Sequence, residues 1–281
     1  MTNKMNKFKG SENYVVTKEL MNAVNVSIAL EKPLLIKGEP GTGKTMLAEA
    51  IAEALDMELI IWSIKSTTKA QEGLYVYDTV QRLYDSQFGE GDVANIKKYI
   101  KLGKLGEAFT ADKQPVLLID EIDKADLEFP NDLLWELDKM EFYINETKET
   151  IKTKTRPIVI ITSNAEKELP DAFLRRCIFH YIEFPTKEKM EEIIKVHYGD
   201  IEKNLMNQAM EAFYKIREMK EIQKRPSTSE LLDWLQALML AGVNVQQITK
   251  EIPYVGVLLK KNQDIEVMYE VKEKGYSLRR W

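Results

Sequence analysis

The segment Gly-Glu-Pro-Gly-Thr-Gly-Lys-Thr, from Gly38 to Thr45, restricts the fold of this chain more than any other feature of its sequence. It matches the pattern G-x-x-x-x-G-K-[ST], in which the glycines let backbone N–H groups close around a phosphate group. Such a loop needs a buried strand before it and a helix after it, so that the phosphate lies at the helix N-terminus. Residues 34–36 are apolar, and apolar residues recur at helical spacing in residues 45–56. The sequence therefore predicts a phosphate-binding P-loop.

Two residues of this loop have separate predicted roles. Lys44 is expected to reach the β- and γ-phosphates of a nucleotide, and the Thr45 hydroxyl is expected to hold Mg²⁺. The predicted nucleotide-binding residues are those of the loop, the helix residue after it and an acid described next: Gly38, Glu39, Pro40, Gly41, Thr42, Gly43, Lys44, Thr45, Met46 and Asp120.

A second motif follows the apolar run at residues 116–119, which ends in Asp120 and Glu121. Asp120 is predicted to bind Mg²⁺ through water, as the corresponding Asp does in P-loop NTPases. Glu121 is placed to orient and deprotonate a water molecule that attacks the γ-phosphate. An enzyme that phosphorylates a substrate gains nothing from an activated water, so the pair favours nucleotide hydrolysis. Asp123 is either a further part of the site or a surface or helix-start acid, with equal weight.

Short apolar runs alternate with longer amphipathic segments, which predicts βαβ units and a mainly parallel sheet. The expected strands are residues 33–37, 58–62, 115–120, 157–162 and 178–182. After Pro185 the periodicity is helical, at residues 188–198, 204–222 and 227–240. We therefore expect an α/β core over residues 1–184 and a small helical lid over residues 185–250. Residues 251–281 form a C-terminal tail that the sequence does not assign.

Composition excludes several other classes of protein. The chain has 281 residues with 2 His and 1 Cys, which makes an intrachain disulfide impossible and a structural zinc site implausible. No apolar run approaches the roughly 20 residues of a membrane helix, and the polar, basic start lacks the apolar segment of a secretory signal. A net charge of −5 gives no general attraction to nucleic acid. We expect a cytoplasmic chain with no membrane segment.

Three later segments complete an ordered set of motifs. Thr-Ser-Asn at residues 162–164 ends the fourth predicted strand, residues 169–177 contain two adjacent arginines, and Arg225-Pro226-Ser227 precedes a lid helix. Together with the P-loop and the Asp-Glu strand end, this order resembles AAA+ ATPases. Residues 117–138, 158–177 and 226–234 resemble the MoxR family in particular. The resemblance runs from about Tyr14 to Leu240 and implies an AAA+ P-loop fold that binds and hydrolyses ATP with Mg²⁺.

The resemblance also implies residue roles. Asn164 matches sensor 1, a polar group that helps to position the attacking water, although Asn also favours turns for structural reasons. Arg175 and Arg176 lie where the arginine finger of the family falls, which supplies charge to the γ-phosphate bound by a neighbouring subunit. Arg176 is favoured, and the alternative is an ion pair with a local acid such as Asp171. A finger that acts on a neighbour requires a ring, and the resemblance implies a homohexamer.

The sequence departs from the family at sensor 2, where Ser227-Thr228-Ser229 replaces the usual Arg. Ser227 and Glu230 fit the capping box S-x-x-E, which predicts a helix start at Ser227. Arg225 and its neighbour Lys224 are then the nearest cations. Arg225 is given equal weight as a nucleotide contact and as a solvated basic residue.

Two further segments are candidate contact surfaces. Residues 139–154 have the pattern of a β-hairpin and resemble the hairpin that precedes sensor 1 in this branch, which faces the central pore. Residues 66–109 form an insert whose tyrosines and lysines either contact a partner or serve ordinary packing and solvation. The residues concerned are Tyr75, Tyr77, Tyr84, Lys97, Lys98, Lys101 and Lys104.

The leading functional hypothesis is an AAA+ ATPase of MoxR type that remodels or activates a partner protein. The resemblance implies a separate partner with a von Willebrand factor A domain. The alternative is a nucleic-acid motor subunit of a restriction or helicase-like complex, which the net acidity disfavours. A simple nucleotide-binding switch is disfavoured by Glu121, Asn164 and the arginine pair, which all serve hydrolysis. The sequence does not separate ATP from GTP.

Overall fold

The computed structural model describes residues 8–89, 92–164 and 166–273. The chain divides into two compact units, each with its own hydrophobic core. The first unit comprises Met1–Gly38 and Gly43–Ile182, and the second comprises Glu39–Thr42 and Glu183–Trp281.

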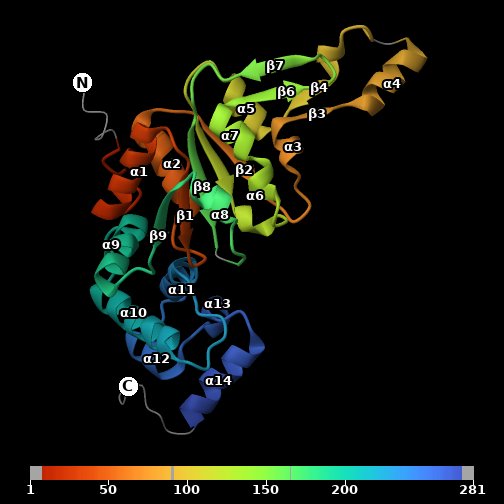
Figure 1. Ribbon diagram of the computed structural model, residues 1–281. Helices are drawn as coiled ribbons and strands as arrows, with labels where there is room; N and C mark the ends of the chain where they lie inside the picture. The colour runs from red at the N-terminus through yellow and green to blue at the C-terminus, as the bar shows by residue number, and fades with distance from the viewer. Residues whose placement is uncertain (1–7, 90–91, 165, 274–281) are drawn as a thin grey trace. The chain divides into compact units, whose positions relative to one another are not determined.

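The first unit is built on a five-stranded sheet in the order β2-β5-β8-β1-β9, with every pair of neighbours parallel (Figure 1). The strands are β1 (Leu34–Gly38), β2 (Leu59–Ser63), β5 (Val116–Asp120), β8 (Ile158–Ser163) and β9 (Ile178–Ile182). Each bound lies within one residue of the expected one, and the prediction of a parallel five-stranded P-loop fold is confirmed. The central strands β5 and β8 are buried on both faces, which is why they appear in the sequence as continuous apolar runs.

Successive residues of each central strand enter two different cores, because side chains alternate between the faces of a sheet. Leu118 packs with helices α1 (Lys18–Leu30) and α2 (Lys44–Leu55). Leu117 and Ile119 pack into the opposite core. The helices on that side are α3 (Ala70–Leu74), α5 (Lys104–Thr110), α6 (Phe129–Asp132), α7 (Leu134–Lys139) and α8 (Asp171–Leu174).

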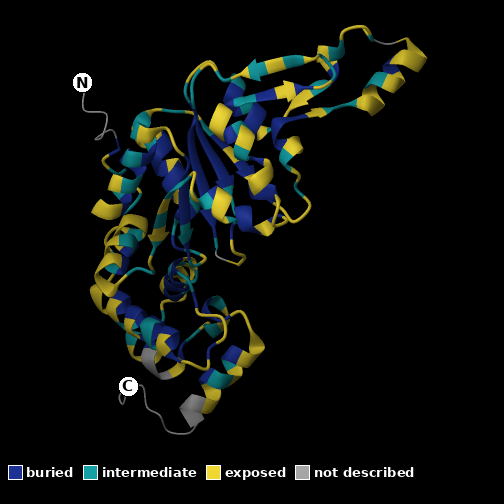
Figure 2. Cartoon of the chain, in the orientation of Figure 1, coloured by how far each residue is buried: buried dark blue, intermediate teal, exposed yellow. Residues whose placement is uncertain are grey.

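The insert between β2 and β5 carries an antiparallel pair, β3 (Tyr75–Tyr77) with β4 (Ile100–Leu102), and between them α4 (Thr79–Phe88) and the 3-10 turn η1 (Ile96–Tyr99). Tyr75 is buried in the core, so its part of the expected contact surface is ordinary packing. Three of the four lysines form ion pairs: Lys97 with Glu149, Lys101 with Asp78 and Lys104 with Glu107. Tyr84 is exposed on α4, where much of the surface is yellow in Figure 2.

The predicted hairpin is present. Strands β6 (Glu141–Ile144) and β7 (Glu149–Lys152) pair antiparallel, with Phe142 opposite Ile151. Phe142 packs into the same core as β5, which attaches the hairpin to the first unit.

The second unit is helical and packs around Phe213 and Trp234. Its helices are α9 (Lys187–Tyr198), α10 (Lys203–Glu218), α11 (Thr228–Leu240), α12 (Val245–Glu251), α13 (Val255–Leu258) and α14 (Asn262–Glu273). The capping box is formed by Ser227 and Glu230, so α11 starts where the sequence predicts. Helix α10 ends at Glu218, four residues earlier than expected, because Ile222 fills the same core from an irregular segment. Within the described ranges, no helix combines the length and the apolarity needed to cross a membrane.

Candidate active site

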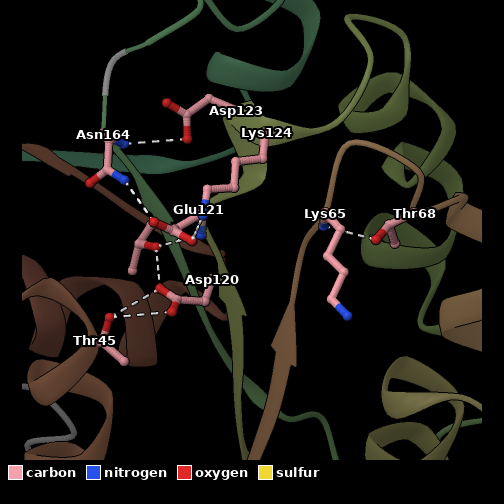
Figure 3. Close-up of polar contacts among 9 residues, drawn as sticks. Thr45, Lys65, Thr68, Asp120, Glu121, Asp123, Lys124 and Asn164 are labelled. Carbon is pink, nitrogen blue, oxygen red and sulfur yellow. Dashed lines mark hydrogen bonds and ion pairs between the residues drawn. The ribbon is translucent and has the colours of Figure 1, made fainter. Parts of the chain in front are cut away.

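The candidate site lies at the carboxyl ends of three neighbouring strands, β1, β8 and β5. The P-loop follows β1, Asp120 ends β5, and Asn164 follows β8. Because the strands are parallel, these three ends lie at one edge of the sheet, where open α/β folds bind their ligands. Figure 3 shows the side chains of Thr45, Asp120, Glu121 and Asn164 gathered at this edge.

The end of the P-loop has the backbone that its glycines permit. Gly43 has φ of 80°, in the left-handed region, and a Cβ atom there would lie 3.2 Å from the ring of Tyr14. Helix α2 begins at the next residue, Lys44, which is only 6% exposed. Its ammonium group donates a hydrogen bond to the Gly38 carbonyl at 2.9 Å. A cation and the N-terminal N–H groups of a helix are therefore held at the mouth of the loop.

The four residues Glu39–Thr42 belong to the second unit, and an arginine that the sequence did not single out contacts them there. Arg217 donates to Glu39 Oε2 at 2.7 Å and to the Pro226 carbonyl at 2.5 Å, and its guanidinium stacks on Phe184. Arg217 is only 8% exposed, so it is a buried cation paired with the Glu39 carboxylate. Its signal in the sequence is an arginine four residues after Phe213, on the apolar face of α10.

The two predicted metal ligands contact each other. The Thr45 hydroxyl donates to both carboxylate oxygens of Asp120, at 3.2 and 3.3 Å. Hydroxyl and carboxylate oxygens suit Mg²⁺, which usually takes one or two protein ligands and completes its shell with phosphate and water. No cluster of three or more His, Cys, Asp or Glu that could hold a metal occurs among the residues the structure describes, so an all-protein site is not found there.

Glu121 and Asn164, the predicted catalytic pair, are in direct contact. The Asn164 amide nitrogen donates to Glu121 Oε1 at 2.9 Å, and Lys124 forms an ion pair with Oε2. The hydrogen bond and the charge of Glu121 raise the pKa of Lys124. Glu121 itself has φ of 58°, a left-handed conformation that costs a non-glycine residue about 1–2 kcal/mol. Its side chain is 33% exposed, so water can reach it.

Thr162 is a site residue for which the sequence pattern predicts no role. It is fully buried in β8, donates its hydroxyl proton to Asp120 Oδ1 at 2.6 Å and accepts the Glu121 backbone N–H at 2.8 Å. One hydroxyl group therefore connects the carboxylate that faces Thr45 to the backbone of Glu121. A threonine at the end of an otherwise apolar strand is the signal that marks it.

Asp123 is not a surface acid, because only 2% of the residue is exposed. It lies in the 3-10 turn η2 (Ile122–Lys124), directly after Glu121. Its carboxylate accepts the backbone N–H of Asn164 at 3.3 Å and that of Glu166 at 2.9 Å.

The arginine residues differ in their surroundings. Arg176 forms an ion pair with Asp138 at 2.7 Å and donates to the Ala172 carbonyl at 2.8 Å. The local acid is therefore Asp138 on α7, and Asp171, the expected partner, is exposed at the start of α8. Arg175 is exposed, and Arg225 is exposed in the second unit.

Met46, the predicted nucleotide-binding residue that follows the P-loop, lies on the first turn of α2 and is 38% exposed.

In a comparison with known protein families, residues 34–186 match the family model "ATPase family associated with various cellular activities (AAA)". Pachytene checkpoint protein 2 of Saccharomyces cerevisiae is 26% identical over 197 residues, which are 62% of this chain and 32% of that protein. Its Homo sapiens homologue is 24% identical over 223 residues, covering 75% and 48%. The ATP-dependent zinc metalloprotease FtsH of Karelsulcia muelleri is 28% identical over 180 residues, covering 61% and 25%.

This chain matches a quarter to about half of the length of these relatives. The Thermotoga maritima RuvB Holliday junction branch migration motor has a similar structure, with a TM-score of 0.55, 16% identity, and coverage of 92% of this chain and 74% of that one. At this identity the likeness concerns the fold alone. The matching model describes the AAA family as a whole, and the named relatives are pachytene checkpoint and FtsH proteins, so the narrower MoxR prediction is not established.

Proposed function

The chain belongs to the AAA family of ATPases, and from that membership we propose that it works in a ring to remodel a partner protein at the expense of ATP. As a member of the family it binds ATP and is an ATPase. The observation that carries the proposed site is the convergence of Thr45, Asp120, Glu121 and Asn164 at the β1–β8–β5 edge. The loop before α2 supplies the phosphate-binding groups at the same edge.

The proposed chemistry divides among these residues. Lys44 and the N–H groups at the start of α2 hold the β- and γ-phosphates. Thr45 and Asp120 hold Mg²⁺, which when bound neutralises phosphate charge and aligns the γ-phosphate. Glu121 accepts a proton from the water whose oxygen attacks the γ-phosphorus, and ADP leaves. Asn164 keeps Glu121 oriented through the 2.9 Å hydrogen bond to Oε1.

Thr162→Val is expected to slow ATP hydrolysis by about tenfold and to lower the free energy of unfolding by about 1–3 kcal/mol. Valine keeps the shape of the buried side chain but removes the 2.6 Å hydrogen bond to Asp120 Oδ1 and leaves the Glu121 N–H without its acceptor. Thr162→Ser keeps the hydroxyl and is the matched control. Phosphate release and denaturant unfolding measure the two effects; a valine variant that hydrolyses ATP like the serine variant would remove Thr162 from the site.

We propose that the ring is a homohexamer in which an arginine of one subunit reaches the γ-phosphate of its neighbour. Arg175 and Arg176 are the candidates; Arg175 is exposed, and Arg176 would have to exchange its pairing with Asp138 for the phosphate. We propose Arg225 as the candidate sensor 2 cation. Its exposed guanidinium is available to a phosphate.

A mixing experiment tests the finger. Arg175→Ala or Arg176→Ala, whichever residue is the finger, should lower ATP hydrolysis by about 10³-fold, as removal of an arginine finger does elsewhere. Mixed with Lys44→Ala, which keeps both arginines but lacks the P-loop lysine, the finger variant should recover part of the wild-type rate in shared rings. If both arginine variants retain full activity, or if no mixture recovers any, the finger in trans is wrong. Sedimentation of each mixture reports whether rings form.

Protein remodelling is favoured over nucleic-acid transport as the use of the ATP. One relative in sequence, FtsH, is by its name an ATP-dependent metalloprotease, whereas the Holliday junction motor resembles this chain in fold alone. The net charge of −5 also disfavours a general nucleic-acid contact. The narrower proposal is a MoxR-type protein with a von Willebrand factor A domain partner. ATP hydrolysis measured with and without duplex DNA or RNA should be unchanged; stimulation of severalfold would favour the motor.

A further inference from the structure

The carboxylate of Asp123 joins two loops that carry the proposed catalytic pair. Asp123 comes two residues after Glu121, in the turn that follows β5. It accepts backbone N–H groups from Asn164 and Glu166, which follow β8. Figure 3 shows the Asp123 side chain directed to the Asn164 backbone, on the other side of Glu121 from Asp120 and Thr45. Asp123 therefore faces the loop after β8, away from the predicted metal ligands.

Because Asp123 is buried, its carboxylate depends on the two N–H groups of the loop after β8. A carboxylate that is 98% buried loses its hydration and needs hydrogen bonds to compensate. Here two backbone N–H groups of one loop supply them, at 3.3 and 2.9 Å. Charge-assisted bonds of this kind are about twice as strong as neutral ones. A loop that donates both cannot move away without leaving a buried charge unpaired.

A second contact joins the same two loops, and again the loop after β8 is the donor. Lys167 donates from its ammonium group to the carbonyl of Ala125 at 2.8 Å and to that of Lys124 at 3.4 Å. The turn after β5 thus accepts bonds from the loop after β8 at both of its ends. The two loops are therefore joined by polar contacts at Asn164, Glu166 and Lys167.

We propose that Asp123 is a positioning residue for ATP hydrolysis, which holds the Asn164 backbone so that its side chain meets Glu121. The inference rests on the roles proposed above for Glu121 and Asn164. The backbone N–H that Asp123 accepts and the side-chain amide that donates to Glu121 Oε1 belong to the same residue, Asn164. Asp123 acts through Asn164.

A double-mutant cycle in ATP hydrolysis tests the proposal. Asp123→Asn preserves size but turns an amide NH₂ toward a backbone N–H, so one of the two bonds is lost. We expect kcat to fall by about 10- to 100-fold, from the loss of a hydrogen bond to a charged group. ATP affinity, measured by titration, should stay within about twofold, because the P-loop is untouched. Asp126→Asn, an exposed acid of the same segment, is the control and should leave both values unchanged.

The combination with Asn164→Ala distinguishes positioning from general destabilisation. If Asp123 acts through Asn164, the double variant should hydrolyse ATP no more slowly than Asn164→Ala alone. Effects that multiply would overturn the inference while leaving the role of Asn164 intact. If Asn164→Ala by itself leaves kcat unchanged, the proposed role of Asn164 fails, and the inference fails with it.

If Asp123→Asn does not fold, a variant of Lys167, which forms the second contact between the two loops, tests the proposal instead. Lys167 is exposed, so Lys167→Met leaves the buried carboxylate intact and removes only the bonds to Ala125 and Lys124. It should lower kcat severalfold with unchanged ATP affinity, and only when Asn164 is present. An equal effect of Lys167→Met in the Asn164→Ala background would contradict the proposal.

Discussion

Lys44→Ala is expected to abolish measurable ATP binding and, with it, hydrolysis. The Lys44 ammonium is held among the loop residues at the start of α2, where its positive charge adds to that of the helix N-terminus. Alanine keeps the helix, since it is the best helix former, but removes the only side-chain cation of the Gly38–Thr45 segment. We expect ATP affinity to fall by about 100-fold or more, the equivalent of one or two charge-assisted hydrogen bonds.

Isothermal titration with ATP measures this loss directly. Lys32→Ala, an exposed lysine before β1, is the matched control and should bind ATP like the wild type. Circular dichroism of both variants checks that the fold is kept. Near-native ATP affinity of Lys44→Ala would show that the Gly38–Thr45 segment is not the phosphate-binding loop.

Glu121→Gln is expected to bind ATP with near-native affinity and to hydrolyse it about 10²- to 10⁴-fold more slowly, the range for loss of a general base. Glutamine keeps the length of the side chain and an oxygen that can accept the Asn164 bond. It cannot accept a proton from water at neutral pH. The binding step should be unaffected, because the Lys44 ammonium bonds to the Gly38 carbonyl and the Thr45 hydroxyl bonds to Asp120.

Steady-state phosphate release at saturating ATP measures the rate. Glu128→Gln, at an exposed acid just before α6, controls for the loss of one negative charge. If Glu121→Gln hydrolyses ATP as fast as this control, Glu121 is not the general base, and another carboxylate must serve.

The sheet could be predicted from the sequence because burial imposes a simple pattern on it. Strands β5 and β8 are covered on both faces, and a strand so covered has to be a short apolar run between polar breakers. The P-loop and the capping box at Ser227 are local in sequence as well, since their hydrogen bonds join residues within one turn of helix or loop.

The contacts that complete the site are not local, and no pattern along the chain reveals them. Thr162 meets Asp120 across 42 residues, and Asp123 meets Asn164 across 41. The partner of Arg176 is Asp138, 38 residues away, although Asp171 is closer in sequence. Which acid pairs with which donor depends on strand order and loop conformation, which the sequence specifies only through the whole fold.

The nucleotide that remains on Glu121→Gln after incubation with ATP and Mg²⁺ tests the central claim most directly. The central claim is that this chain binds ATP through the P-loop and cleaves it with a water activated by Glu121. Protein freed of unbound nucleotide, denatured and analysed by ion-exchange chromatography should therefore release ATP from the variant and ADP from the wild type. ADP released from the variant as from the wild type would contradict the account, because ATP would then be cleaved without Glu121.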